Sequence, residues 1–233
     1  MAKSDKESVG DKNISAVEEA LSKTEKYIEK NQKIIMYVIG AIVVVVGGYM
    51  LFKKFYLEPK EEEAQKQMFW AERYFEKDSL DLALNGDGNN IGFLEVIDEY
   101  GMTKASNLAH YYAGMCLLKK GQYEEAIDQL EDFDSDDQLV APMATGAIGD
   151  AYMELGDNDK ALKQYMEAAD MNNNQFSTPF FLMKAGWTYE VMGNYDEALK
   201  LYERIRTDYY KSVEWREIDK YITRAKALSS SKE

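Results

Sequence analysis

The fold of this chain is decided by residues 106–137, which have the sequence SNLAHYYAGMCLLKKGQYEEAIDQLEDFDSDD. The first half of this stretch can form a helix that ends at Gly121, because glycine adopts the left-handed backbone conformation at little cost. A second apolar run at helical spacing follows and includes Ala126 and Leu130. The stretch therefore predicts two short helices that pack against each other, with Gly114 and Ala126 allowing their close approach.

The same pattern recurs twice further along the chain. The equivalent positions are Gly114, Gly149 and Gly186, then Gly121, Gly156 and Gly193, then Ala126, Ala161 and Ala198, and finally Leu130, Tyr165 and Tyr202. The first glycines are 35 and 37 residues apart, close to the roughly 34 residues of a tetratricopeptide repeat. An arbitrary helical bundle would share the apolar period but not this glycine register. Residues 105–206 therefore resemble the tetratricopeptide repeat family, and residues 61–100 resemble it loosely.

Helices are also expected on both sides of these repeats. Pro59 can begin a helix at its first turn, and a break at residues 85–90 separates it from a short helix over Phe93–Tyr100. These two helices predict a degenerate first repeat. Ser212 can cap a final helix that covers the last repeat. The expected fold is an all-α solenoid over residues 61–228, with one degenerate repeat, three clearer repeats, a C-terminal capping helix and a tail at 229–233.

An uncharged stretch precedes the repeats. Residues 34–52 have the sequence IIMYVIGAIVVVVGGYMLF and are flanked by Lys33 and by Lys53 with Lys54. Nineteen helical residues extend about 28 Å, enough for a bilayer core of about 30 Å. A buried core helix rarely stays apolar on every face for this length, and a cleaved signal peptide would not begin after 33 residues and end at two lysines. The sequence predicts a transmembrane helix at 34–52 and a juxtamembrane connection at 53–60.

The N-terminal tail, residues 1–33, has a helical pattern of its own. Ile14, Val17, Leu21 and Ile28 recur at helical spacing, and Ser15 with Glu18 fits a capping box. The pattern predicts an amphipathic helix that either docks on a partner or the membrane surface, or remains a solvated lead-in. Four lysines lie close to each end of the apolar stretch, so the lysine count does not set the membrane orientation.

Charge and cysteine usage limit the possible partners and chemistry. The net charge is −14, and residues 61–233 carry 18 basic and 34 acidic side chains. Such a surface repels nucleic acid and anionic lipid headgroups. Cys116 is the only cysteine and lies in an apolar helical run, which favours a buried hydrophobic role over a reactive thiol.

No catalytic arrangement is evident. His110 is the only histidine and occupies a position where a packing residue is expected, so it is interpreted as a core or boundary residue. No nucleophile can be matched with a base, and no phosphate-binding glycine loop precedes a helix. The chain is therefore expected to be a non-enzymatic interaction module without a cofactor.

Two acidic loops were candidates for a metal site. Asn85, Asp87 and Asn89 resemble the start of an EF-hand loop, but Asn90 and Val96 replace the required glycine and glutamate. The second loop contains Asp132, Asp134, Asp136 and Asp137. These carboxylates are expected to cap the next helix and remain hydrated, and no metal site is predicted.

The repeat resemblance implies a binding surface on the first helix of each repeat. Counted by the family's positions, the first repeat contributes Leu108, Tyr111, Met115, Leu118 and Lys119, the second Met143, Asp150, Met153 and Glu154, and the third Phe180, Met183, Trp187, Glu190 and Val191. Methionine-rich surfaces adapt to different apolar side chains, which favours binding of peptides or client proteins. Permanent cover by another helix of the chain or by a second subunit is the alternative, and the oligomeric state is left open.

A wider resemblance covers nearly the full chain. Residues 106–137 and residues 181–205, FLMKAGWTYEVMGNYDEALKLYERI, are similar to ancillary subunits of the bacterial SecYEG translocon that have periplasmic chaperone character. The resemblance implies a single-pass inner-membrane protein with a periplasmic C-terminal domain, association with SecYEG, and transient contact with emerging secreted polypeptides. A structural scaffold for another cell-envelope complex with one fixed protein partner is the second hypothesis.

Overall fold

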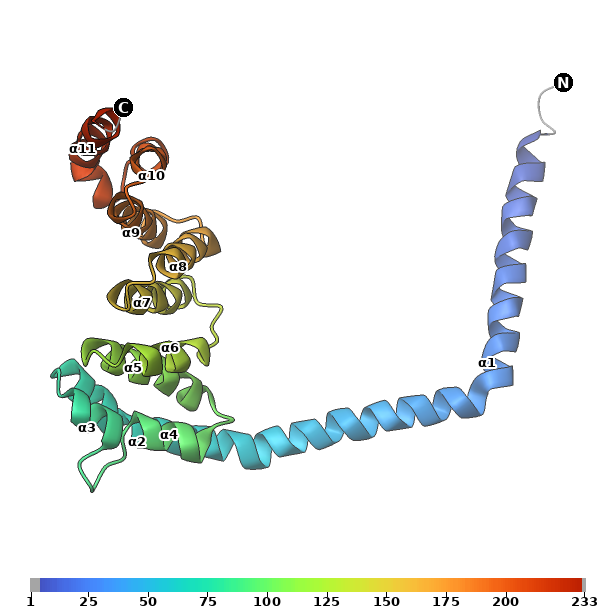
Figure 1. The fold of residues 1–233 in the computed structure, drawn as a ribbon. Coiled ribbons are helices and arrows are strands. Elements are labelled where there is room, and N and C mark those ends of the chain that lie inside the picture. The colour runs from blue at the N-terminus through green and yellow to red at the C-terminus, as the bar shows by residue number, and fades with distance from the viewer. Residues whose placement is uncertain (1–4, 232–233) are drawn as a thin grey trace. The chain divides into compact units, whose positions relative to one another are not determined.

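The chain forms two compact units, residues 1–58 and residues 59–233. The computed structural model describes the backbone of residues 5–231 and the side chains of Glu25 and residues 27–231, and all regular elements in this part of the chain are helical (Figure 1). The first unit contains α1 (Asp5–Phe52) and η1 (Lys53–Leu57). The second unit contains the repeats and the C-terminal helix. The expected all-α fold is confirmed.

Helix α1 contains the uncharged stretch. The most apolar window of the helix has a mean hydropathy of 2.5 and none of it is buried, so the helix is long and apolar enough to cross a membrane. Because α1 begins at Asp5, Ser15 lies inside the helix and the predicted capping box is wrong. The side chains of Ile14, Val17 and Leu21 lie outside the described residues.

Helical structure continues through the predicted juxtamembrane connection. Residues Lys53–Leu57 form a π-helix in which the Glu58 N–H donates to the Lys53 carbonyl, and α2 (Glu58–Glu76) follows directly. Pro59 has no N–H, and in a regular α-helix its ring would meet the carbonyl of Phe55. The wider π-turn changes the register ahead of the proline and accommodates its ring. Pro59 therefore lies in the first turn of α2, as predicted, and the connection ahead of it is helical.

The degenerate first repeat has one helix more than the sequence predicts. Helix α2 is followed by α3 (Leu80–Asn85) and by α4 (Phe93–Tyr100), the last at the predicted residues. The three clearer repeats are pairs of helices stacked along the domain (Figure 1). The pairs are α5 (Lys104–Lys119) with α6 (Tyr123–Glu131), α7 (Val140–Glu154) with α8 (Asn158–Met171), and α9 (Ser177–Val191) with α10 (Tyr195–Asp208).

Glycines allow the two helices of each pair to approach closely. A Cβ atom at the first glycine of each repeat would lie under 3.0 Å from one side chain of the second helix. The contacts join Gly114 to Leu130, Gly149 to Tyr165 and Gly186 to Tyr202. The equivalent alanines, Ala126, Ala161 and Ala198, are fully buried. These contacts confirm the role predicted for the glycine, alanine and large-residue positions.

The second glycine of each repeat ends the first helix. Gly121, Gly156 and Gly193 have φ angles of +76°, +78° and +76°, where a side chain would be strained. Each glycine comes two residues after the last helical residue, at Lys119, Glu154 and Val191. The predicted helix ends are therefore confirmed.

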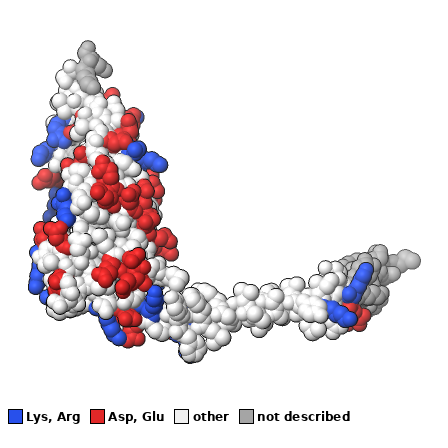
Figure 2. Space-filling view, turned by 60° about the horizontal axis from the view of Figure 1, so that its bottom comes forward, with Lys and Arg blue, Asp and Glu red and all other residues white. Residues whose placement is uncertain are grey.

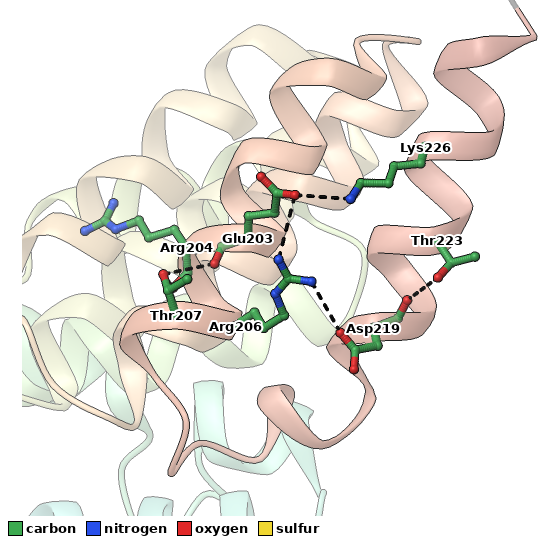
Figure 3. A network of polar contacts seen from close by, with 7 residues as sticks. All are labelled: Glu203, Arg204, Arg206, Thr207, Asp219, Thr223 and Lys226. Carbon is green, nitrogen blue, oxygen red and sulfur yellow. Dashed lines mark hydrogen bonds and ion pairs between the residues drawn. The ribbon is translucent and has the colours of Figure 1, made fainter.

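A short 3-10 helix, η2 (Glu214–Glu217), and α11 (Ile218–Ser230) close the end of the domain. Ile218, Ile222 and Ala225 of α11 are buried in the core beside α10. Ion pairs also join α10 and α11. The Arg206 guanidinium of α10 lies 3.9 Å from the Glu203 carboxylate and 3.8 Å from the Asp219 carboxylate of α11 (Figure 3). Lys226 of α11 reaches back to Glu203 at 3.4 Å. This packing is the arrangement expected of a capping helix.

Candidate partner-binding groove

A groove of about 460 Å³ runs along the first helices of the three clearer repeats. It is lined by Leu118, Tyr123, Asp150, Met153, Glu154, Tyr165, Lys184, Trp187, Thr188 and Val191. Leu118 belongs to α5, Asp150 and Met153 to α7, and Trp187 and Val191 to α9. Side chains from three successive repeats therefore share one depression.

The structure brings together only some of the residues assigned by family position. Leu118, Asp150, Met153, Glu154, Trp187 and Val191 line the groove. Met183 does not, because it is buried with 4% of its surface exposed and packs in the core. Leu108 lines a separate depression of about 350 Å³ between α2 and α5.

The remaining assigned residues lie outside the groove lining. Tyr111 and Met115 are half-buried and pack against the core between α6 and α7, and Met143 packs against the core of the last repeats. Burial raises the pKa of Tyr111. Phe180 keeps part of its ring exposed and packs edge-on against Phe181, with centroids 5.0 Å apart.

Asp150 is the polar centre of the groove. Its Oδ1 accepts hydrogen bonds from Lys184 Nζ at 2.7 Å and from the Tyr165 hydroxyl at 2.6 Å. Lys184 Nζ also lies 5.5 Å from the Tyr165 ring centroid and 5.2 Å from that of Phe180. Burial, reinforced by the Asp150 carboxylate, raises the pKa of Tyr165 far above its usual value. Two donors on one carboxylate hold the groove floor in a fixed arrangement.

Glu154 and Tyr123 form one polar side of the groove. The Tyr123 hydroxyl donates to Glu154 Oε2 at 3.3 Å, and this hydrogen bond joins two neighbouring repeats. Burial raises the pKa of Tyr123, and the nearby Glu154 carboxylate adds to the increase. Met153 supplies the apolar surface next to this pair, and its sulfur accepts a hydrogen bond from Thr188 at 3.5 Å.

Glu190 does not line the groove but makes its contacts at the C-terminal end of the repeat domain. Its carboxylate accepts hydrogen bonds from the buried Tyr202 and from Arg224 of α11. Burial raises the pKa of Tyr202, and the Glu190 carboxylate raises it further. Tyr221 of α11 lies between these groups and Trp187, with 5.9 Å between the ring centroids of Trp187 and Tyr221. The capping helix thus supports one end of the groove through an aromatic contact.

His110 and Cys116 lie where packing residues were expected. His110 is half-buried, and its Nδ1 is 3.0 Å from Oε1 of Gln129 on α6. Cys116 is fully buried, and burial raises its pKa to about 12. Both positions agree with the packing roles predicted from the sequence.

The two acidic loops make hydrogen bonds within the protein. Asp87 accepts from the Tyr74 hydroxyl and from the backbone N–H groups of Asn89 and Asn90, and these bonds lower its pKa. Asp137 Oδ1 accepts from the N–H groups at the start of α7, as the capping prediction requires. Among the described residues, no group of three or more histidine, cysteine or acidic side chains is positioned to hold a metal ion.

Four lining residues were missed by counting family positions: Tyr123, Tyr165, Lys184 and Thr188. Tyr165 was recognised only as a packing residue. The sequence does contain a signal for Lys184, because it is the only charged residue in the segment Ser177–Tyr189. A lone cation in an apolar helix requires a partner, and Asp150 is the acid nearest the middle of the preceding first helix.

Comparison with known proteins agrees with the repeat geometry. Residues 108–136 and 147–211 match family profiles of the tetratricopeptide repeat. These segments are tetratricopeptide repeats. The matched segments contain the groove-lining residues of all three repeats. The fold is accordingly that of a protein–protein interaction module.

The similar proteins show the fold alone. Superkiller complex protein 3 of Mus musculus is 23% identical over 137 residues, which are 58% of this chain and 8% of that protein. The chain thus spans less than a tenth of the curated relative it matches. A crystal structure of nearly identical TPR-like repeats, from a Podosopora anserina protein described as a kinesin light chain, has a TM-score of 0.56 at 14% identity and covers 73% of this chain and 88% of that chain. A crystal structure of MamA has a TM-score of 0.53 at 19% identity, with 73% and 94% covered.

Proposed function

We propose that this protein is a membrane-anchored accessory subunit of the bacterial Sec translocon, whose tetratricopeptide domain binds emerging secreted polypeptides like a chaperone. Helix α1 is the single-pass anchor in the inner membrane, and the repeat domain lies on the periplasmic side. The observation that carries the proposal is the groove, which combines the apolar Leu118, Met153 and Trp187 with polar side chains. Within the described part of the chain, the groove is open.

The chemistry of the groove suits polypeptide segments of varied sequence. Met153 has a flexible, polarisable side chain, and Trp187 offers a large flat surface with 41% of its area exposed. Asp150 and Lys184 satisfy each other, so the groove floor can contact an apolar side chain without leaving a charge unpaired. Glu154 is exposed at one side and favours clients with basic residues.

Anchoring compensates for weak binding. A groove held beside a channel exit meets each emerging segment at high effective concentration, so a low and unselective affinity is sufficient. The apolar stretch of α1 supports this arrangement because it has the length of a bilayer core.

Site-specific photocrosslinking tests the proposal. A photoreactive residue replaces Met153 or Trp187 in the full chain, in membrane vesicles where a secreted polypeptide is stalled during translocation. Both sites are expected to give adducts with the stalled chain, while the control site Lys163, exposed on α8, gives none. No adduct from either groove site would overturn the proposal. One stoichiometric adduct with a resident envelope protein would instead support a scaffold with one fixed partner.

A further inference from the structure

An exposed apolar residue recurs directly ahead of the first helix in successive repeats. Leu139 precedes α7, Phe176 precedes α9 and Val213 precedes η2. The three residues are 37 positions apart, and 50%, 77% and 71% of their surfaces are exposed. We name these three residues the apolar edge. Met102, two residues ahead of α5 and also exposed, continues the series into the preceding repeat.

The local backbone holds the apolar edge in place. Asp137 Oδ1 accepts the N–H groups of Leu139 and Val140, and Asn174 Oδ1 accepts those of Phe176 and Ser177 in the same way. Two successive loops thus present their apolar side chains from equivalent turns. Because these turns are already formed, a partner that binds here loses little loop entropy.

This recurrence is unusual for surface loops. Single exposed apolar residues are common on protein surfaces and need no explanation. Here three of them recur at one repeat position, and their contact with water is unfavourable. They lie directly ahead of helices, whereas the groove described above is formed mainly by the first helices of the repeats. The apolar edge is therefore a second surface, separate from the groove.

The charge around the apolar edge indicates what it contacts. The loop ahead of Leu139 exposes Asp132, Asp134 and Asp136 and contains no basic residue. The loop ahead of Phe176 is uncharged and follows the exposed Asp170, and the loop ahead of Val213 follows the exposed Asp208 and contains one basic residue, Lys211. The loops between α6 and α7 and between α8 and α9 lie on the right-hand side of the repeat domain in Figure 1, and acidic side chains gather on that side in Figure 2. Anionic lipid is repelled by this surface, whereas a basic protein segment is attracted.

We propose that the apolar edge docks a protein segment in which basic and apolar side chains alternate. The apolar side chains cover Leu139, Phe176 and Val213. The basic side chains pair with exposed aspartates ahead of these positions, which are Asp134 and Asp136 ahead of α7, Asp170 near the end of α8 and Asp208 at the end of α10. This docking is independent of the groove and of its occupant, so the domain can hold a fixed partner at its edge while the groove is free.

Peptide binding to the full chain in mild detergent tests the proposal. The probe is a peptide of repeated Lys-Leu-Ser triplets, and the controls are Lys-Ser-Ser and Glu-Leu-Ser peptides of the same length. The triple variant Leu139→Ser, Phe176→Ser and Val213→Ser is expected to weaken binding of the Lys-Leu-Ser peptide about tenfold or more. Leu94→Ser, which removes an exposed apolar residue of α4 that belongs to neither the groove nor the apolar edge, is expected to leave this affinity unchanged. Equal binding by the triple variant and the native chain would overturn the proposal.

The charge requirement is tested separately. Asp134→Asn with Asp136→Asn is expected to weaken binding of the Lys-Leu-Ser peptide and to reduce its salt dependence, because two attractive charges are lost. Thermal unfolding curves of all variants should match that of the native chain, since the altered side chains are exposed. Binding that is insensitive to both the serine and the asparagine variants would show that the peptide lies elsewhere and contradict the proposal.

A spin label attached at Phe176→Cys distinguishes the proposed protein segment from two other occupants of the apolar edge, a membrane and a second copy of the chain. Cys116 is buried with a raised pKa, so the label reacts at position 176. In proteoliposomes of the full chain, the label is expected to be accessible to aqueous relaxation reagents and to become protected when the Lys-Leu-Ser peptide is added. Protection by lipid without peptide, or dipolar broadening between two labelled copies, would overturn the proposal in favour of a membrane or a second copy.

Discussion

Two helices of this protein, α1 and α9, carry many large apolar side chains, but among the described residues only those of α9 are buried by the rest of the structure. In α9, nine of the 15 residues are buried, because α8 and α10 cover it from two sides. In α1, the most apolar window has no buried residue within the described part of the chain. The comparison shows that an apolar sequence predicts that a helix is shielded from water, but not which part of the molecule or its surroundings shields it. Helix α9 is shielded by its neighbouring repeat helices, whereas under the proposed function the bilayer shields the stretch at residues 34–52.

The largest effect is expected from a side chain added to a glycine of α9. Gly186→Val would force the buried Tyr202 ring out of its position and is expected to lower the free energy of unfolding by about 4 kcal/mol. Gly47→Val is the matched control, because a Cβ there meets no atom within 4 Å. Denaturant unfolding of both variants tests the difference. Equal losses of stability would contradict the assignment of these two glycines to different environments.

A charge in the middle of α1 is expected to have a somewhat smaller effect, on membrane retention. Val44→Arg should disfavour membrane insertion by about 3 kcal/mol without changing the unfolding of the repeat domain. The measurement is the fraction of the chain that resists alkaline extraction from membranes. Val191→Arg, at the exposed end of α9, should leave that fraction unchanged. If Val44→Arg with Val45→Arg is retained like the native chain, α1 is not the anchor.

A smaller loss is expected where α9 contacts α7 through polar groups. Asp150→Ala removes the acceptor of both Lys184 and Tyr165 and is expected to cost about 1–2 kcal/mol of stability, since both partners keep some access to water. Glu154→Ala, which has one long hydrogen bond, should cost less. A double-mutant cycle with Lys184→Met measures the coupling. A coupling near zero would show that the ion pair does not stabilise the groove floor.

The smallest effect is expected from removing the side chains that cap the N-termini of α7 and α9. Asp137→Ala removes the carboxylate that caps α7, and Asn174→Ala removes the amide in the equivalent position ahead of α9. Each should lower the melting temperature by a few degrees at neutral pH. Hydrogen bonds from the Val140 and Leu139 N–H groups lower the pKa of Asp137, so its contribution is present above the usual aspartate pKa and is lost as the pH falls below it. The difference in melting temperature should narrow in acid for Asp137→Ala and persist for Asn174→Ala.

The features that the sequence predicted are those imposed by local geometry. Position 186 must be small and position 202 large for the two helices of the pair to pack closely, and Gly193 must adopt a positive φ. Because the same requirements hold in each repeat, the residue types recur in the sequence. Helix ends and the register of the pairs followed from them. The helix over residues 34–52 was also predicted from the sequence, whereas its place in a membrane stays a prediction.

The features that the sequence did not predict depend on how repeats stack. Met183 was assigned to the binding surface by its position, yet it is buried because α9 packs against the previous repeat through Phe181, which occupies the space above Gly146. Lys184 points to Asp150, 34 positions away, and this pairing depends on the rotation between successive repeats. Such a rotation results from many small packing contacts and has no sequence signature in one repeat.

The interlocked Gly–Tyr pairs make the length of this domain adjustable in discrete steps. Gly149 with Tyr165 and Gly186 with Tyr202 are the same pair, displaced by 37 residues. Removal or duplication of one 37-residue unit between them would join matching halves, so each remaining tyrosine would still meet a glycine. A length change inside a helix pair, between a glycine and its tyrosine, would instead shift the ring out of register with the glycine. The groove and the apolar edge can therefore be lengthened or shortened together, one repeat at a time, without redesign of the core.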